Sequence, residues 1–225
     1  MRYQVILFDL DGTLLDTLGD LTASVNAVLR RRGRPERTED EVRRFVGNGS
    51  EMLIRRALPE GCGDDEVQDI LREYLAYYAA HCQERTRPYD GVLPMLRALR
   101  AEGRRLAVVT NKPDDAAQIL VRHHFGDLIE TTVGLAPTRR RKPAPDMPEE
   151  ALAALGAAKE TAVYVGDSET DVRVAENAEL PEIAVSWGFR TREQLLAAGA
   201  ETIAESAAEL LTLLRQDEKP KTAEQ

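Results

Sequence analysis

The pattern of hydrophobic and polar residues divides the chain into two kinds of region. Between about residues 16 and 84, apolar residues recur at every third or fourth position, which is typical of the buried face of a helix. From about Arg87 onward, short apolar runs alternate with helical patterns. The runs, which predict β-strands, are residues 106–109, 131–133, 162–165 and 183–185.

One more apolar run precedes the helical region, at residues 5–8. It is uncharged and rich in β-branched and aromatic side chains, as in strands that are buried on both faces. Strands that alternate with helices form a parallel sheet. The first strand must join that sheet, because a lone strand among helices would leave its backbone groups without hydrogen-bond partners. The helical block is then an insertion after the first strand.

We therefore predict an α/β fold, in which a Rossmann-like parallel-sheet core is flanked by helices and carries an inserted all-helical cap. The predicted core comprises residues 1–15 and 86–225, and the predicted cap comprises residues 16–85. A chain of 225 residues is long enough for one sizeable domain with such an insertion. The last ten residues, 216–225, are polar and are predicted to be disordered.

Composition and charge narrow the range of partners. The chain is 43% hydrophobic and 31% charged, as soluble globular proteins are, and no apolar stretch approaches the roughly 18 residues that span a bilayer. We expect a cytoplasmic protein, since no basic-then-apolar leader precedes the first strand. Cys62 and Cys82 lack nearby metal-ligand partners and are expected to be free thiols in a reducing compartment. A net charge of −9 argues against binding to nucleic acid.

Polar side chains cluster where the predicted strands end. Because the carboxyl ends of parallel strands meet at one edge of a sheet, we expect the clusters that follow strands to converge there. Neighbouring buried carboxylates are costly unless a cation compensates them, and Mg²⁺ prefers such oxygen ligands. The clusters are Asp9 with Asp11, then Thr110-Asn111-Lys112, then Lys142, and finally Gly166-Asp167-Ser168 with Asp171.

The chemistry that uses such a set is phosphoryl transfer through an aspartyl-phosphate. One carboxylate attacks phosphorus, while a hydroxyl, backbone N–H groups and an ammonium hold the other phosphate oxygens. A second carboxyl group protonates the leaving alkoxide and later deprotonates the attacking water. Asp11 fits this second task, because its side chain points away from that of Leu10 and toward that of Asp9. Asp167 would complete a metal site.

Each cluster also has an ordinary structural interpretation when it is taken alone. Thr110 and Asn111 are common strand-end turn residues, and a single lysine such as Lys142 is usually on the surface. Asp167 alone could cap a helix, and Asp171 could be an acid favoured by the helix dipole. The joint pattern, in this order along the chain, is what favours the catalytic interpretation.

That pattern resembles the haloacid dehalogenase superfamily of phosphohydrolases. The four motifs of the superfamily appear in order, and the helical insertion resembles the cap that follows the first motif, so the resemblance covers nearly the whole chain. Within the superfamily, four segments are similar to the phosphoglycolate phosphatase group. These segments are residues 8–15, 46–49, 110–113 and 166–168.

The resemblance implies a role for each motif residue. Asp9 is the expected nucleophile and Asp11 the expected general acid and base. Asp9, Asp167 and the backbone oxygen of Asp11 are expected to hold Mg²⁺. Thr110, Asn111 and Lys142 are the expected substrate-binding residues, and the expected substrate is a small phosphorylated metabolite, with 2-phosphoglycolate as the first candidate.

Several alternatives stay open at this point. A sugar phosphomutase, a pyrophosphatase or a nucleotide phosphatase could use the same residues, and a receiver-type phospho-acceptor domain gathers similar side chains without being an enzyme. Asp171 could bind the metal or only support the residues that do. The turn at residues 47–49 could reach the site from the cap or simply end a helix.

Overall fold

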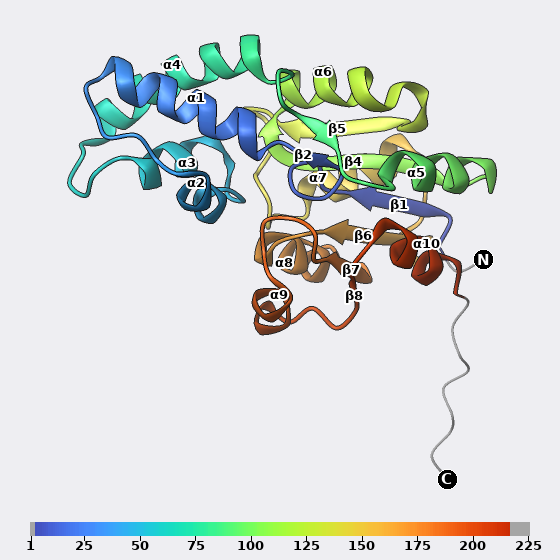
Figure 1. Cartoon of the computed structure of the whole chain (residues 1–225). Coiled ribbons are helices and arrows are strands. Elements are labelled where there is room, and N and C mark those ends of the chain that lie inside the picture. The colour runs from blue at the N-terminus through green and yellow to red at the C-terminus, as the bar shows by residue number, and fades with distance from the viewer. Residues whose placement is uncertain (1–2, 217–225) are drawn as a thin grey trace.

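The computed structural model describes residues 3–216 and has a parallel β-sheet at its centre (Figure 1). Within these residues the sheet has six strands in the order β5-β4-β1-β6-β7-β8, and every neighbouring pair is parallel. The strands are β1 (Val5–Phe8), β4 (Arg105–Pro113), β5 (Thr131–Leu135), β6 (Ala162–Gly166), β7 (Glu182–Val185) and β8 (Ile203–Ala204). The prediction of an α/β parallel-sheet fold is confirmed.

Strand β1 lies between β4 and β6, so it is paired on both edges. Helices cover both of its faces. Val5 is aligned with Arg105 of β4 on one side and with Ala162 of β6 on the other. All four residues of β1 are buried, which explains why this strand carries an uninterrupted apolar run. Asp9, which directly follows β1, therefore lies at the centre of the carboxyl edge of the sheet.

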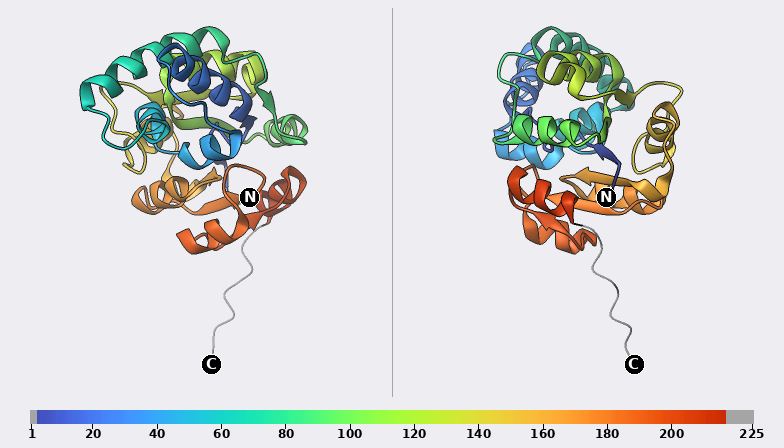
Figure 2. Two further views of the ribbon diagram at one scale, coloured as in Figure 1. Left: turned by 60° about the vertical axis from the view of Figure 1, so that its left-hand side comes forward. Right: turned by 90° about the vertical axis from the view of Figure 1, so that its right-hand side faces the viewer.

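Alternate strand residues pack against helices on opposite faces of the sheet (Figure 2). Ile6 and Phe8 belong to the core that includes α5 (Val92–Ala101), α6 (Asp114–Phe125) and α10 (Ala207–Arg215). Val5 and Leu7 face the second core, beneath α7 (Asp146–Ala154) and α8 (Glu169–Asn177). Helix α9 (Arg192–Ala198) packs near β7 and β8.

Four helices form the inserted cap at one end of the sheet (Figure 1). They are α1 (Leu18–Arg31), α2 (Glu39–Phe45), α3 (Gly49–Ala57) and α4 (Asp64–His81). Short strands β2 (Leu15–Asp16) and β3 (Arg87–Pro88) pair antiparallel where the chain leaves and re-enters the core. This pairing, which the hydrophobic pattern did not predict, brings both connections of the cap together. The exact cap limits of 16 and 85 remain a prediction.

The structure also bears on the remaining sequence expectations. Cys62 and Cys82 are free thiols. Within residues 3–216, no helix combines the length and the apolar composition needed to cross a bilayer. Of the tail predicted to be disordered, residues 217–225 lie outside the described part of the chain.

Candidate active site

A cavity lies between the carboxyl edge of the sheet and the cap. Five of the predicted site residues line it, and Lys142 is buried directly behind Asp9. The cap contributes mainly apolar and glycine residues to the same cavity. The cap residues are Leu21, Val46, Gly47, Gly49, Ser50, Leu53, Tyr74 and Tyr78, and the predicted core residues are Asp9, Asp11, Thr110, Asn111 and Asp167.

Asp9 is the central carboxylate and is 9% exposed. Its Oδ1 atom accepts a hydrogen bond from the Leu10 backbone N–H at 2.7 Å and lies 3.0 Å from Lys142 Nζ. Burial raises the pKa of Asp9 to about 7; Lys142 opposes this shift, and the nearby Asp171 and Asp11 add to it. Burial and the two neighbouring carboxyl groups thus both disfavour the charged form of Asp9.

Lys142 is a fully buried ammonium group that joins several site residues. Its Nζ atom lies 2.8 Å from Asp171 Oδ1 and donates to the hydroxyl of Tyr164 at 3.0 Å. Burial alone would lower the pKa of Lys142, but attraction to Asp171 and Asp9 outweighs it and raises that pKa well above its usual value. Lys142 is therefore a permanent positive charge behind Asp9.

Asn111 holds Lys142 in place through its side-chain amide. Asn111 Oδ1 accepts from the Lys142 backbone N–H at 2.7 Å, and Asn111 Nδ2 donates to the Lys142 carbonyl at 3.2 Å and to the Gly47 carbonyl at 3.3 Å. Asn111 thus binds both the lysine segment and the cap turn. Thr110 is 2% exposed and lines the cavity beside it.

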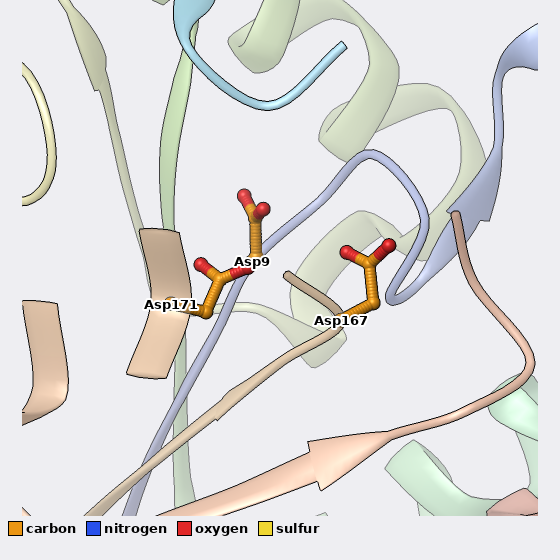
Figure 3. A group of neighbouring side chains, drawn as sticks. All are labelled: Asp9, Asp167 and Asp171. Atoms are coloured by element: carbon orange, nitrogen blue, oxygen red, sulfur yellow. The ribbon is translucent and has the colours of Figure 1, made fainter. Parts of the chain in front are cut away.

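Asp9, Asp167 and Asp171 form a cluster of three carboxyl groups (Figure 3). Each offers an oxygen atom within 4.8 Å of the others. Burial, together with repulsion from Asp171 and Asp9, raises the pKa of Asp167 well above its usual value. Buried oxygen donors that repel one another are chemically suited to a hard divalent cation, so the residues present fit Mg²⁺.

The two acids beside Asp9 differ in the partners they already have. Asp171 accepts at both oxygens: Oδ1 from Lys142 and Tyr164, and Oδ2 from the Ser168 backbone N–H at 3.1 Å and hydroxyl at 2.6 Å. Asp167 has fewer donors, namely the Thr13 hydroxyl at 3.1 Å and the Phe189 N–H at 2.7 Å. We infer that Asp171 orients Lys142 and that Asp167 is the carboxylate better placed to bind a metal.

Gly12 allows the backbone after Asp11 to pass close to Asp167. Its φ angle is +85°, a conformation that favours glycine, and a methyl group at this position would overlap the Asp167 carboxylate. The glycine of the first motif is thus required by the close approach of the two segments that carry Asp11 and Asp167.

Lys112 is a site residue to which the sequence analysis gave no role. Its Nζ atom lies 2.8 and 3.0 Å from the two carboxylate oxygens of Asp11 and 4.6 Å from the ring centre of Tyr78 in α4. The signal was present in the sequence, because Lys112 directly follows Thr110 and Asn111. Its two partners could not be inferred, since they lie in distant segments of the chain.

Residues 6–185 match the haloacid dehalogenase-like hydrolase family, and the chain belongs to this family. A phosphoglycolate phosphatase of Nitrosococcus oceani is 33% identical over 221 residues, which cover 95% of this chain and 97% of that protein. An N-acetylmuramic acid 6-phosphate phosphatase of Pseudomonas aeruginosa is 32% identical over 216 residues, covering 95% and 96%.

Solved structures show the same relationship. A proposed phosphoglycolate phosphatase from Lactobacillus delbrueckii subsp. bulgaricus superposes with a TM-score of 0.91 at 36% identity, over 95% of this chain and 99% of the other. CbbY from Rhodobacter sphaeroides, solved with phosphate, gives a TM-score of 0.78 at 28% identity, over 92% and 96%. The resemblance seen in the sequence is confirmed, and the chain is a phosphomonoester hydrolase. The receiver-type alternative does not apply to it.

Proposed function

We propose that this phosphatase hydrolyses a small phosphomonoester, with 2-phosphoglycolate as the best candidate, through an aspartyl-phosphate formed on Asp9. The observation that carries the proposal is the meeting of Asp9, Asp11 and Asp167 around one cavity, with Lys142 directly behind Asp9. Mg²⁺, held by Asp9, Asp167 and the Asp11 backbone oxygen, would reduce the repulsion between the carboxylates and the phosphate.

The first step is attack by Asp9 on phosphorus. Because the Leu10 N–H and Lys142 both contact Oδ1, we assign the attack to Oδ2. The bond between phosphorus and the ester oxygen breaks, and Asp11 gives its proton to that oxygen as it leaves. Thr110 holds a phosphate oxygen, Lys142 supplies a positive charge behind Asp9, and Asn111 keeps the Lys142 backbone fixed.

The second step releases phosphate. A water molecule attacks the phosphorus of the aspartyl-phosphate, and Asp11, now a carboxylate, accepts the proton of that water. The bond between phosphorus and Asp9 breaks, which restores the Asp9 carboxylate. Both carboxyl groups thus end in their initial protonation states.

The surroundings of Asp11 support a substrate with a second negative charge. To donate a proton, Asp11 must be in its acid form, and a neutral acid does not form an ion pair with the ammonium group of Lys112. Lys112 therefore needs another anionic partner during the reaction. The carboxylate of 2-phosphoglycolate would supply it. The Tyr78 hydroxyl, buried and without a hydrogen-bond partner among residues 3–216, can donate to the same group.

The cap supports a small substrate. Leu53, Tyr74 and Tyr78 line the cavity on the cap side. Strands β2 and β3 pair with each other, which keeps the two connections of the cap together beside the site. We propose that residues 16–85 act as a lid that excludes water and selects the substrate. We also propose a cytoplasmic location for this activity, as the sequence predicts.

The test is a comparison of phosphate release across phosphomonoesters in the presence of Mg²⁺. We expect the highest kcat/KM with 2-phosphoglycolate, compared with N-acetylmuramic acid 6-phosphate, xylulose 1,5-bisphosphate, pyrophosphate and AMP. Asp9→Asn keeps the shape of the side chain but lacks the nucleophile and should release no phosphate. A clear preference for another substrate would contradict the proposed specificity, and an active Asp9→Asn would contradict the mechanism. Isomerisation of a sugar phosphate without phosphate release would identify a mutase.

A further inference from the structure

Arg190 connects the core to the cap turn beside the cavity. It lies in the core, between β7 and α9, and is 9% exposed. On the cap side, its Nη1 donates to the Arg43 carbonyl at 3.1 Å and its Nη2 to the Val46 carbonyl at 2.8 Å. On the core side, Nε and Nη2 donate to the two carboxylate oxygens of Glu169 at 2.7 and 3.2 Å. One guanidinium group therefore joins the end of α2 in the cap to the start of α8 in the core.

The cap partners of Arg190 are carbonyl groups at the end of helix α2. The last carbonyls of a helix have no partner within the helix and form the negative end of its dipole, so a cation is favourable there. The planar guanidinium group presents several donors in a fixed geometry and can bind both carbonyls at once. A lysine, with three donors on a single nitrogen, cannot match all four hydrogen bonds that Arg190 makes.

The turn that follows α2 is held by two more core residues. Asn111 donates to the Gly47 carbonyl at 3.3 Å, and Asn48 donates to the Thr170 hydroxyl at 3.2 Å. Gly47 has a φ angle of +121°, and a methyl group there would lie 3.3 Å from Arg190 Nη2. The glycine thus lets the turn rest directly on the guanidinium group.

The loop of Arg190 also reaches the carboxylate cluster. The backbone N–H of the preceding residue, Phe189, donates to Asp167 Oδ2 at 2.7 Å. Gly188 packs so tightly that a methyl group there would overlap both Gly12 and Asp167. A displacement of this loop would therefore change the position or the hydrogen bonding of the Asp167 carboxylate.

We propose that Arg190 is a positioning residue that holds the cap turn, residues 46–49, over the site and couples cap closure to the loop that supports Asp167. Glu169 makes this contact reversible. When the cap opens, Arg190 loses two carbonyl groups but keeps its carboxylate partner, so no buried charge is left unpaired. The proposal concerns cap closure, and only its kinetic test rests on the proposed substrate.

The first test is hydrogen exchange of the full-length protein, comparing wild type with Arg190→Gln. We expect amides of residues 42–49 to exchange about 10- to 100-fold faster in the variant, as the loss of hydrogen bonds to a charged group implies. Amides of α4 and of the sheet should be unchanged. The matched control is Arg192→Gln, which removes a nearby exposed arginine paired with Glu205 at 3.3 Å and should change nothing. Unchanged exchange at 42–49, or uniformly faster exchange throughout the protein, would overturn the proposal.

The second test separates positioning from a general loss of structure. In Arg190→Gln, kcat/KM for 2-phosphoglycolate should fall about 10- to 100-fold, while that for p-nitrophenyl phosphate should fall much less, because its good leaving group depends less on an enclosed acid. Equal losses for both substrates would contradict the proposal. Arg190→Lys keeps the charge beside Glu169 and should be intermediate, and it serves as the test variant if Arg190→Gln does not fold. A wild type inactive on 2-phosphoglycolate would refute the substrate, while hydrogen exchange would still decide the role of Arg190.

Discussion

The ammonium nitrogen of Lys112 lies 2.8 Å from one carboxylate oxygen of Asp11 and 3.0 Å from the other, beneath the ring of Tyr78. The two charged residues are 101 positions apart in the sequence. This ion pair joins the proposed general acid to the cation that we propose binds the carboxylate of the substrate. It therefore provides the most direct test of the substrate.

Lys112→Met should weaken recognition of an anionic substrate. Methionine has a similar length and packs against Tyr78, but it cannot bind a carboxylate. We expect kcat/KM for 2-phosphoglycolate to fall about 10- to 100-fold, the usual effect of one charged hydrogen bond, and that for p-nitrophenyl phosphate to change little. Lys159→Met removes a surface lysine paired with Glu179 and is the control. Similar losses for both substrates would mean that Lys112 serves the chemistry in general.

Asp11→Asn should affect substrates according to their leaving groups. An alkoxide needs a proton in the transition state, whereas nitrophenolate largely does not, and general acid catalysis contributes roughly 10²–10⁴-fold. We therefore expect a loss of this size with 2-phosphoglycolate and a much smaller loss with p-nitrophenyl phosphate. Steady-state kinetics on the two substrates measure the difference. Equal losses would remove Asp11 from the acid role.

Mg²⁺ should stabilise the wild-type fold through Asp167. At a concentration about 100 times Kd, the expected increase in Tm is roughly 5–10 °C. Asp167→Asn should largely abolish this increase. Without Mg²⁺ the variant should be at least as stable as the wild type, because burial and the repulsion from Asp171 and Asp9 raise the pKa of Asp167.

Calorimetry with Mg²⁺ and with a chelator checks this prediction. Asp127→Asn, which changes an exposed aspartate, should respond to Mg²⁺ as the wild type does. A full Mg²⁺ response in Asp167→Asn would show that Asp167 is not a ligand.

Glu182 should make the stability of the protein depend on pH. Burial, with a smaller effect of Asp171, raises the pKa of Glu182 from 4.5 to about 8, and its Oε1 atom is buried without a hydrogen-bond partner among residues 3–216. The folded state thus favours the acid form, so this contribution to stability is present below pH 4.5 and is lost as the pH rises through about 8.

Glu182→Gln stays neutral and should remove that dependence. We expect the variant to gain about 1–3 kcal/mol in free energy of unfolding near pH 9, relative to wild type, and little near pH 4.5. Urea denaturation at the two pH values measures the difference, and the exposed Glu201→Gln is the control. A gain that is equal at both pH values would contradict this account.

The sequence by itself determined the class of fold and which polar side chains gather at the carboxyl edge of the sheet. Hydrophobic periodicity reports directly which side of each element faces the core, so the helical insertion and the principal strands could be predicted. Parallel strands bring their carboxyl ends together, so Asp9, Asp11, Thr110 and Asp167 could be expected at one edge. The short strands β2, β3 and β8 were missed, because two-residue strands are too short to show a period.

Only the tertiary structure decided which side chains pair with one another. Lys112 meets Asp11, Asn111 binds the Lys142 backbone, and Arg190 reaches the cap from a loop 144 positions beyond Val46. Each of these contacts joins segments that are distant in the sequence. Such contacts depend on how distant segments of the chain pack together, and a local pattern of residues carries no information about that packing.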